Sequence, residues 1–542
     1  MIQGFCAPRA ARGLPSRAAR LALTIAVAAA LPALAQQSVP PAPQSAASPV
    51  FAIKGFQVTG DNPLSEAETA SVLAPYLRPD ATIETLQKAT AALEAALRDR
   101  GFGLHRVALP PQEVGDKVTL NIVKFTISRV TMEPLKIYDE ANIRRSIPEL
   151  KEGKTPNFKV LAVQTAIANE SPNKQIQVGI KESDEPDKID ATVSVKESRP
   201  WTFAASLSNT GSASSGRDRL TLSGGHTNLF NRDHTFIGAY TTSIERTSDV
   251  KQLGLSYKVP LYAAGGVVGV NYTQSDVVGN FGAFSSTGAG HTFGVNYTHY
   301  LPPDGGRRSY VTVAYDDKLF RATMINDQTI GVDRRSRPLT LGYASRTETD
   351  TAVWGYNVDL AFNLTGGAGN DLASYQAEDP NIQTTRWKAL RGGANYSASI
   401  WNNWVWSARG QYQYSADALI SGEQFGLGGL GSVRGTSIER PLSGDKGLSA
   451  TLELTTPELA PGLRALGFVD AGWLGNNNPA PPKPSTDHLA SAGLGLRYGV
   501  GAYAVALDYA YILSGSRVPL SLNSAAPQRG DDRFYINLSV RF

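Results

Sequence analysis

The sequence predicts an all-β membrane barrel of sixteen antiparallel strands, preceded by two small α+β domains with the element order β-α-α-β-β. Three observations lead to this fold class. Apolar and polar side chains alternate along the last eleven residues, an export-type leader opens the chain, and helical periodicity stops after Trp201. No stretch beyond the leader offers the roughly 18 uncharged apolar residues of a membrane-spanning helix, so we expect strands to cross the membrane.

The segment 532–542 is the clearest strand in the sequence. One face is apolar and the other is polar, and the apolar face carries Phe534, Ile536, Leu538, Val540 and Phe542. A tilted strand of about 9–11 residues spans a bilayer. Because unpaired backbone groups are costly in hydrocarbon, one such strand implies a closed barrel. The alternative is an edge strand of a soluble sandwich. We predict that Phe542 is the barrel-assembly signal, read by the barrel assembly machinery during biogenesis.

Residues 1–35 are predicted to be a signal peptide. Several arginines precede an uncharged run over 21–34, and Ala33-Leu34-Ala35 closes that run as an A-x-A cleavage site. The mature chain is therefore expected to begin at Gln36. The only cysteine, Cys6, precedes the apolar run, so we expect no disulfide in the mature protein. A net charge of +4 is too small to indicate a nucleic-acid partner.

The region before the barrel divides into three parts. Residues 36–49 form a Pro-rich lead-in that cannot sustain a helix, since proline in a helix interior costs about 3 kcal/mol. Residues 50–124 predict the first small domain and residues 125–199 the second. In the first domain, we expect a strand over 52–59, helices over 65–78 and 83–100, and two strands ending with 117–123. In the second, we expect strands over 125–132, 175–181 and 189–197, with helices over 139–147 and 158–169.

Residues 200–542 predict the outer-membrane β-barrel. We count sixteen alternating segments, an even number that suits an antiparallel barrel with lipid facing one side of each strand and a wet lumen the other. Short turns alternate with long loops, as in outer-membrane barrels. The segments are 203–208, 219–226, 235–244, 252–259, 267–275, 291–300, 309–315, 338–345, 355–363, 389–398, 405–414, 449–455, 464–473, 491–498, 502–511 and 534–542.

Two motifs lie in the last third of the chain. The long loop over 418–446 contains Val433-Arg434-Gly435-Thr436, and a later strand contains Phe468-x-Asp470-x-Gly472. With the leader and the two β-α-α-β-β units, these motifs resemble the two-partner secretion translocators of the haemolysin secretion/activation family, within the outer-membrane assembly superfamily. That resemblance implies two polypeptide-transport-associated (POTRA) domains and a sixth outer loop that folds into the lumen, where its V-R-G-Y arginine pairs with the aspartate of the F-x-D-x-G strand.

This chain departs from the family pattern at Thr436, where an aromatic residue is expected. The Arg434–Asp470 pair has a physical reason beside the resemblance. A loop of nearly thirty residues held inside a wide lumen loses conformational entropy, and a bidentate arginine–carboxylate contact in a partly desolvated site can offset that loss. Some members thread an amino-terminal helix through the barrel. The prolines of the lead-in argue against such a plug here.

The resemblance implies a passive protein-secretion channel in the outer membrane of a Gram-negative bacterium, with the POTRA domains in the periplasm. Its partner would be a large secreted β-helical exoprotein of the adhesin or haemolysin class, with outer-membrane lipid around the barrel. We expect no catalytic residue, cofactor or metal. The glycines over 426–431 satisfy the dinucleotide-binding pattern G-x-G-x-x-G but follow no strand-to-helix turn. We therefore do not expect a dinucleotide site there. Alternatives are a barrel assembly factor of the same superfamily, a diffusion porin and an outer-membrane enzyme.

Overall fold

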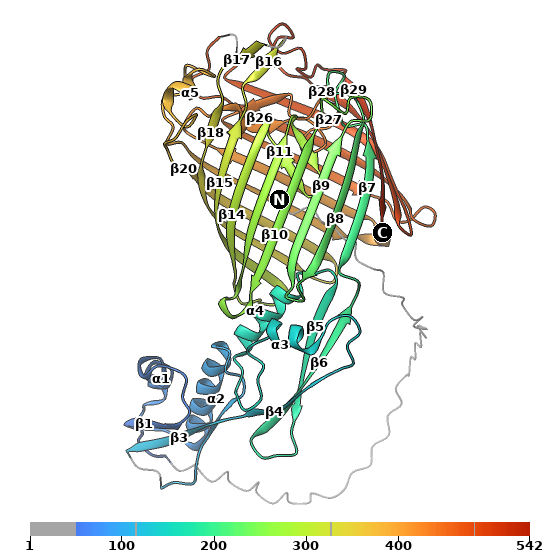
Figure 1. The fold of residues 1–542 in the computed structure, drawn as a ribbon. Helices are drawn as coiled ribbons and strands as arrows, with labels where there is room; N and C mark the ends of the chain where they lie inside the picture. Colours follow the sequence, from blue (N-terminus) through green and yellow to red (C-terminus); the bar gives the residue numbers. More distant parts are fainter. Residues whose placement is uncertain (1–49, 114–115, 326–327, 482) are drawn as a thin grey trace, which may run out of the picture.

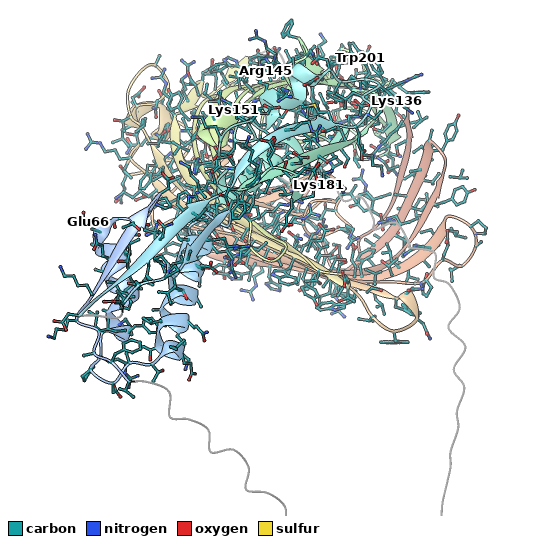
Figure 2. All side chains as sticks on the ribbon, turned by 90° about the horizontal axis from the view of Figure 1, so that it is seen from below. Glu66, Lys136, Arg145, Lys151, Lys181 and Trp201 are labelled. Atoms are coloured by element: carbon teal, nitrogen blue, oxygen red, sulfur yellow. The ribbon has the colours of Figure 1, made fainter. Side chains whose placement is uncertain are left out.

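The protein consists of two small α/β domains followed by a closed β-barrel. In Figure 1 the two domains lie one after the other below the barrel. The computed structural model describes residues 50–113, 116–325, 328–481 and 483–542. The predicted signal peptide and Pro-rich lead-in lie outside these residues. From below, the second small domain lies over the end of the barrel, while the first extends to one side (Figure 2).

The first small domain contains β1 (Gly55–Gly60), α1 (Glu66–Leu73), η1 (Ala74–Tyr76), α2 (Ile83–Asp99), β2 (His105–Ala108) and β3 (Lys117–Lys124). Its sheet has the order β1-β3-β2, with β1 parallel to β3. A capping box between Ser65 and Glu68 begins α1. The apolar stripe of α2, including Leu93 and Leu97, packs on the sheet and forms the domain core.

The second small domain repeats this arrangement. It contains β4 (Thr126–Met132), α3 (Glu140–Ser146), α4 (Phe158–Ala168), β5 (Lys174–Glu182) and β6 (Lys188–Glu197), and its sheet has the order β4-β6-β5. Asn157 caps α4 by accepting hydrogen bonds from two backbone N–H groups of the first turn. Both domains have the β-α-α-β-β order, so the predicted α+β architecture is confirmed.

Sixteen antiparallel strands close the barrel, as the alternation predicts. The strands β18 (Arg334–Ser336) and β19 (Pro338–Glu348) both pair with β15 and are separated only by Arg337. They therefore form one continuous strand of the barrel wall, and each such strand is called a stave below. Each predicted segment coincides with a barrel strand. The staves are β7 (Trp201–Ser208), β8 (Arg219–Leu229), β9 (His234–Thr242), β10 (Gln252–Leu261), β11 (Gly266–Ser275), β14 (Gly290–Tyr300), β15 (Arg307–Phe320), β18 with β19, β20 (Ala352–Asn363), β21 (Lys388–Ser399), β22 (Val405–Tyr414), β25 (Lys446–Thr455), β26 (Leu463–Gly475), β27 (Thr486–Val500), β28 (Tyr503–Ser514) and β29 (Asp532–Arg541).

The first and last strands complete the ring. β29 pairs with β7 over five residues, from Asn537 to Arg541. Phe542 follows β29, donates its backbone N–H to the carbonyl oxygen of Phe203 (2.9 Å) and has an 80% exposed side chain. Its proposed part in barrel assembly stays a prediction.

Several short elements lie in the connections between staves. The turns contain η2 (Tyr262–Ala264) and η3 (Trp401–Asn403), and the long loops contain α5 (Leu372–Gln376), η4 (Ser421–Glu423) and three hairpins. The hairpins are β12 (Gly279–Phe281) with β13 (Phe284–Ser286), β16 (Thr323–Ile325) with β17 (Gln328–Ile330), and β23 (Phe425–Leu427) with β24 (Leu442–Gly444).

The outer and inner faces of the barrel wall differ in the polarity of their side chains, as expected for a barrel in a membrane. On β25 and β26, the side chains of Leu452, Leu454 and Val469 are exposed on the outer face, whereas Thr451 and Asp470 are buried on the inner face. Apolar side chains thus face the lipid and polar ones face the lumen. No helix among the described residues is both long enough and apolar enough to cross a membrane.

Candidate functional site

The loop between β22 and β25, residues 415–445, lies inside the barrel. We call this segment loop 6. Its hairpin side chains Phe425, Leu427 and Leu442 pack with Val433 against inward-facing Leu474 and Leu489 of the wall. The fit is close at Gly472, where an added Cβ would lie 2.1 Å from Leu427 Cδ1. Only glycine leaves room for the loop at this point of β26, which explains the last position of the F-x-D-x-G motif.

Arg434 and Asp470 form a buried bidentate ion pair. Arg434 Nε lies 2.7 Å from Asp470 Oδ2, and Nη2 lies 2.8 Å from Oδ1. The backbone N–H of Arg434 also donates to Oδ2, at 3.1 Å. The exposed fractions are 3% for Arg434 and 0% for Asp470, so water cannot substitute for either partner. The geometry is the fork-to-carboxylate contact that the motifs predict.

The guanidinium of Arg434 has further partners on the wall. Its Nη1 lies 2.8 Å from Glu453 Oε1 on β25 and 3.8 Å from Asp508 Oδ1 on β28. Its carbon lies 3.3 Å from the centre of the Phe468 ring, close enough for a cation–π contact. The motif aspartate is therefore one of three carboxylates around this cation. Glu453 and Asp508 are absent from the motif, although the strand alternation places both on the inner face.

The rest of the loop tip is held through its backbone. Gly435 has a φ of +104°, which favours glycine, and its N–H donates to Tyr535 Oη at 3.0 Å. The Tyr535 hydroxyl donates to the carbonyl oxygen of Thr436 (3.2 Å), and Arg533 Nη1 donates to the same oxygen (3.0 Å). Thr436 itself is 1% exposed. The main chain of the tip is thus fixed by the side chains of Tyr535 and Arg533 on β29, without an aromatic side chain at position 436.

The structure brings six of the predicted residues directly into this site. Val433, Arg434, Gly435 and Thr436 of the loop meet Phe468 and Asp470 of β26, and Gly472 gives the loop hairpin its room. Only Phe542 lies elsewhere. The role of these residues in transport stays a prediction.

A second segment also folds toward the inner wall. Phe281 and Phe284 of the β12–β13 hairpin are buried against Ala239 of β9. An added Cβ on Gly254 of β10 would lie 2.3 Å from the Phe284 ring, so this glycine leaves the space that the ring fills. Loop 6 contacts the same connection, because Arg440 Nη1 donates to the Thr287 carbonyl oxygen at 3.1 Å. The sequence predicts only a long loop here, because three-residue strands are too short for alternation to show.

A buried ion pair joins the second small domain to the barrel. Lys174 Nζ lies 2.6 Å from Asp233 Oδ2, and the exposed fraction of the lysine is 0%. Asp233 belongs to the β8–β9 turn, and its carboxylate also accepts hydrogen bonds from Asn142 Nδ2 (3.0 Å), Ser146 Oγ (3.0 Å) and Tyr262 Oη (2.8 Å). Every oxygen of this carboxylate is satisfied, which a buried charge requires.

The pKa shifts of this junction follow from burial. Burial lowers the pKa of the Lys174 ammonium, an effect that the Asp233 carboxylate opposes. Burial, with the nearby Asp233 charge, raises the pKa of the Tyr262 hydroxyl, so that hydroxyl keeps its proton and remains a donor. Sequence reasoning missed this junction, since Lys174 and Asp233 are far apart in the chain.

Among the residues that the structure describes, no group of three or more His, Cys, Asp or Glu side chains could hold a metal ion.

Comparisons with known proteins agree with this architecture. A family model described as haemolysin secretion/activation protein ShlB/FhaC/HecB matches residues 187–498, more than half of the chain. A model described as POTRA domain, ShlB-type, matches residues 51–124. The chain is similar to the outer membrane transporter CdiB of Escherichia coli, at 23% identity over 506 residues covering 89% of this chain and 83% of the relative. CdiB of Dickeya dadantii is 22% identical over 414 residues, covering 74% and 71%.

Two solved structures have a similar fold. CdiB from Escherichia coli aligns with a TM-score of 0.74 at 20% identity, covering 93% of each chain. CdiB from Acinetobacter baumannii aligns with a TM-score of 0.69 at 16% identity, covering 91% of this chain and 90% of that one.

Proposed function

Because the chain belongs to the ShlB/FhaC/HecB family of haemolysin secretion/activation proteins, we propose that it captures an unfolded exoprotein in the periplasm and passes it outward through the barrel without ATP. The chain is an outer-membrane two-partner secretion transporter with its POTRA domains in the periplasm. Its family consists of transport proteins rather than enzymes.

The observation that carries this proposal is the anchored loop. A sixteen-stranded barrel encloses an aqueous lumen, and loop 6 lies within it, fixed to the wall by the buried Arg434–Asp470 pair. A channel for an extended polypeptide needs polar walls and a loop with a defined path. We infer that loop 6, held at Arg434, lines that path, and that a freed loop would obstruct it.

Capture is assigned to the POTRA domains. In each three-stranded sheet the outer strands pair on one side only, so each keeps a free edge; in the second domain, one such edge is β5. The outer half of β5 is exposed, including Ile180 at 40%. An extended segment of the exoprotein would add a strand to such an edge.

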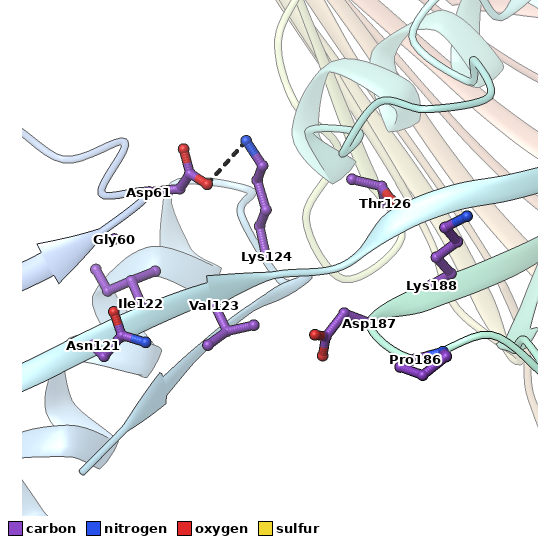
Figure 3. A pocket seen from close by; sticks show the side chains of 10 residues that line it. All are labelled: Gly60, Asp61, Asn121, Ile122, Val123, Lys124, Thr126, Pro186, Asp187 and Lys188. Atoms are coloured by element: carbon purple, nitrogen blue, oxygen red, sulfur yellow. Dashed lines mark ion pairs between the residues drawn. The ribbon is translucent and has the colours of Figure 1, made fainter. Parts of the chain in front are cut away.

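A groove between the two POTRA domains offers an alternative binding site for the exoprotein. It is lined by the end of β3, by Thr126 and by the turn before β6 (Figure 3). An ion pair between Lys124 Nζ and Asp61 Oδ2, at 3.0 Å, borders it. An extended chain lying here would touch both domains at once.

The buried Lys174–Asp233 pair supports the handover from capture to channel. It fixes the second POTRA domain against the β8–β9 turn of the barrel, so a segment held on that domain stays beside the barrel opening. The driving free energy is assigned to folding of the exoprotein outside the cell, where burial of its apolar surface opposes return.

Deletion of the POTRA domains tests the capture step. A candidate exoprotein would be co-expressed with the full chain or with a chain lacking residues 50–197. We expect the shortened protein to remain a heat-modifiable barrel in the outer membrane and to release no exoprotein into the medium, because the wall keeps all its strand pairs. Normal secretion by the shortened protein would overturn the capture assignment.

A further inference from the structure

Loop 6 has a further buried charge between β22 and the loop tip. Glu423, in η4, lies eleven residues before Arg434 and is 2% exposed. Its Oε2 lies 2.8 Å from Arg391 Nη2, and its Oε1 lies 3.1 Å from Lys318 Nζ. Ser336 Oγ donates to Oε1 at 2.5 Å. One carboxylate of the loop therefore faces two cations and a hydroxyl of the wall.

The backbone at Glu423 is held as well. The carbonyl oxygen of Glu423 accepts hydrogen bonds from Arg391 Nη2 and from Gln413 Nε2, both at 3.0 Å. A buried carboxylate is costly unless it is paired and fully hydrogen-bonded. Here both oxygens are satisfied, and the same arginine clamps the main chain. These contacts hold this end of the loop in one place.

The two ends of loop 6 lie on different parts of the wall. The Glu423 partners come from β15, β18 and β21, and the Arg434 partners come from β25, β26 and β28. In the ring of sixteen strands, β15 and β28 are half a ring apart, whereas the nearest strands of the two sets, β21 and β25, are separated only by β22. The charge pattern is also reversed, because the loop supplies an acid to basic wall residues at one end and a base to acidic wall residues at the other.

We propose that Glu423 is a positioning residue that makes loop 6 a strap along the inner wall, fixed at two places, rather than a flap that is held only at Arg434. Its part in transport rests on the proposed function, since it assumes that the exoprotein passes through this lumen. Loss of the Arg434 contact frees the tip but leaves the loop tethered at Glu423. Full release of the strap requires both ends to come free.

Hydrogen exchange of the purified full-length chain in detergent tests the strap directly. Glu423→Gln keeps the side-chain shape and removes only the charge. We expect the amides of residues 419–424 to exchange at least about tenfold faster in this variant, because the local opening of that end becomes easier. The matched control is Glu348→Gln, since Glu348 forms an exposed pair with Arg346 at 3.4 Å. Unchanged exchange over residues 419–424 would overturn the proposal.

A double-mutant cycle separates an ion pair from general loosening. Arg391→Gln should produce at least as large an increase, because it also removes the hydrogen bond to the Glu423 carbonyl oxygen. The double variant with Glu423→Gln should exceed the Arg391→Gln effect only slightly, because the ion pair is already lost in the single variant. Effects that simply add would show that Glu423 does not act through Arg391. The measurement uses no exoprotein, so it is independent of the secretion assay. A failure of POTRA capture would therefore leave the strap intact, and a failure of the strap would leave capture intact.

Discussion

Arg434→Ala is the most informative single change in the loop 6 site. It removes two side-chain bonds to Asp470, the contact with Glu453 and the cation over the Phe468 ring. Asp470 then keeps only the backbone N–H at position 434 and stays buried beside other carboxylates. Removing one partner of a buried pair costs about 3–5 kcal/mol. At about 1.4 kcal/mol per factor of ten, the opening of the loop tip should become roughly a hundredfold to several thousandfold more frequent.

Thiol labelling measures that opening. Ser432 is 7% exposed, and the only natural cysteine, Cys6, lies in the predicted signal peptide. A Ser432→Cys reporter should therefore react slowly with a membrane-impermeant thiol reagent when the tip is anchored, and faster by the stated factor with Arg434→Ala. Arg464→Ala is the matched control, because Arg464 is an exposed residue on the same strand as Asp470. An unchanged labelling rate in Arg434→Ala would refute the anchor.

Secretion by Arg434→Ala should be abolished or strongly reduced while the barrel remains inserted, because every strand keeps its pairing. The charge-swapped double variant, Arg434→Asp with Asp470→Arg, should not recover. The new aspartate would face Glu453 and Asp508, and like charges in a buried site repel each other. Recovery of secretion by the double variant would show that Arg434 and Asp470 act as an isolated pair.

Two further changes test other contacts. Thr436→Tyr restores the family aromatic residue, but Thr436 is only 1% exposed. The larger side chain should overpack the site at a cost of about 1–3 kcal/mol and so speed labelling of the Ser432→Cys reporter. An unchanged labelling rate would contradict this expectation. Lys174→Met leaves Asp233 buried without its cation, which should weaken docking of the second POTRA domain by about 3–5 kcal/mol and increase protease cleavage near residues 198–200. Lys188→Met is its control, because Lys188 forms an exposed pair with Glu185. Equal cleavage in both variants would refute the docking role.

The barrel strands could be predicted because each strand separates two solvents. Lipid on one side and water on the other impose a period of two, and each of the sixteen predicted segments overlaps one barrel strand. Their ends could not be predicted. The segment 449–455 begins later than β25, which starts at Lys446. The charged Lys446 and the side-chain-free Gly447 give no apolar–polar alternation in the sequence, although burial alternates along the strand.

The site could be predicted only where a motif marks it. Arg434 and Asp470 follow from two motifs, but Glu423, Glu453 and Asp508 belong to none. Their contacts depend on which strands are neighbours and on the register between them, and a single sequence shows neither. The Lys174–Asp233 junction is hidden for the same reason, because each residue alone is an ordinary charged residue near a turn.

The two ends of loop 6 use ion pairs where apolar contacts would hold the loop equally well. A buried pair recovers little free energy beyond its desolvation cost, so its net contribution is smaller than its short distances suggest. Removing one partner is costly, however, because the other charge stays buried. When the whole end moves into a wet lumen, water solvates both partners together and the penalty falls. Charged anchors at Glu423 and Arg434 therefore resist a partial loosening of the loop but permit a concerted displacement. Resistance to partial loosening is what the proposed path along loop 6 needs, because a single freed end would lie in that path.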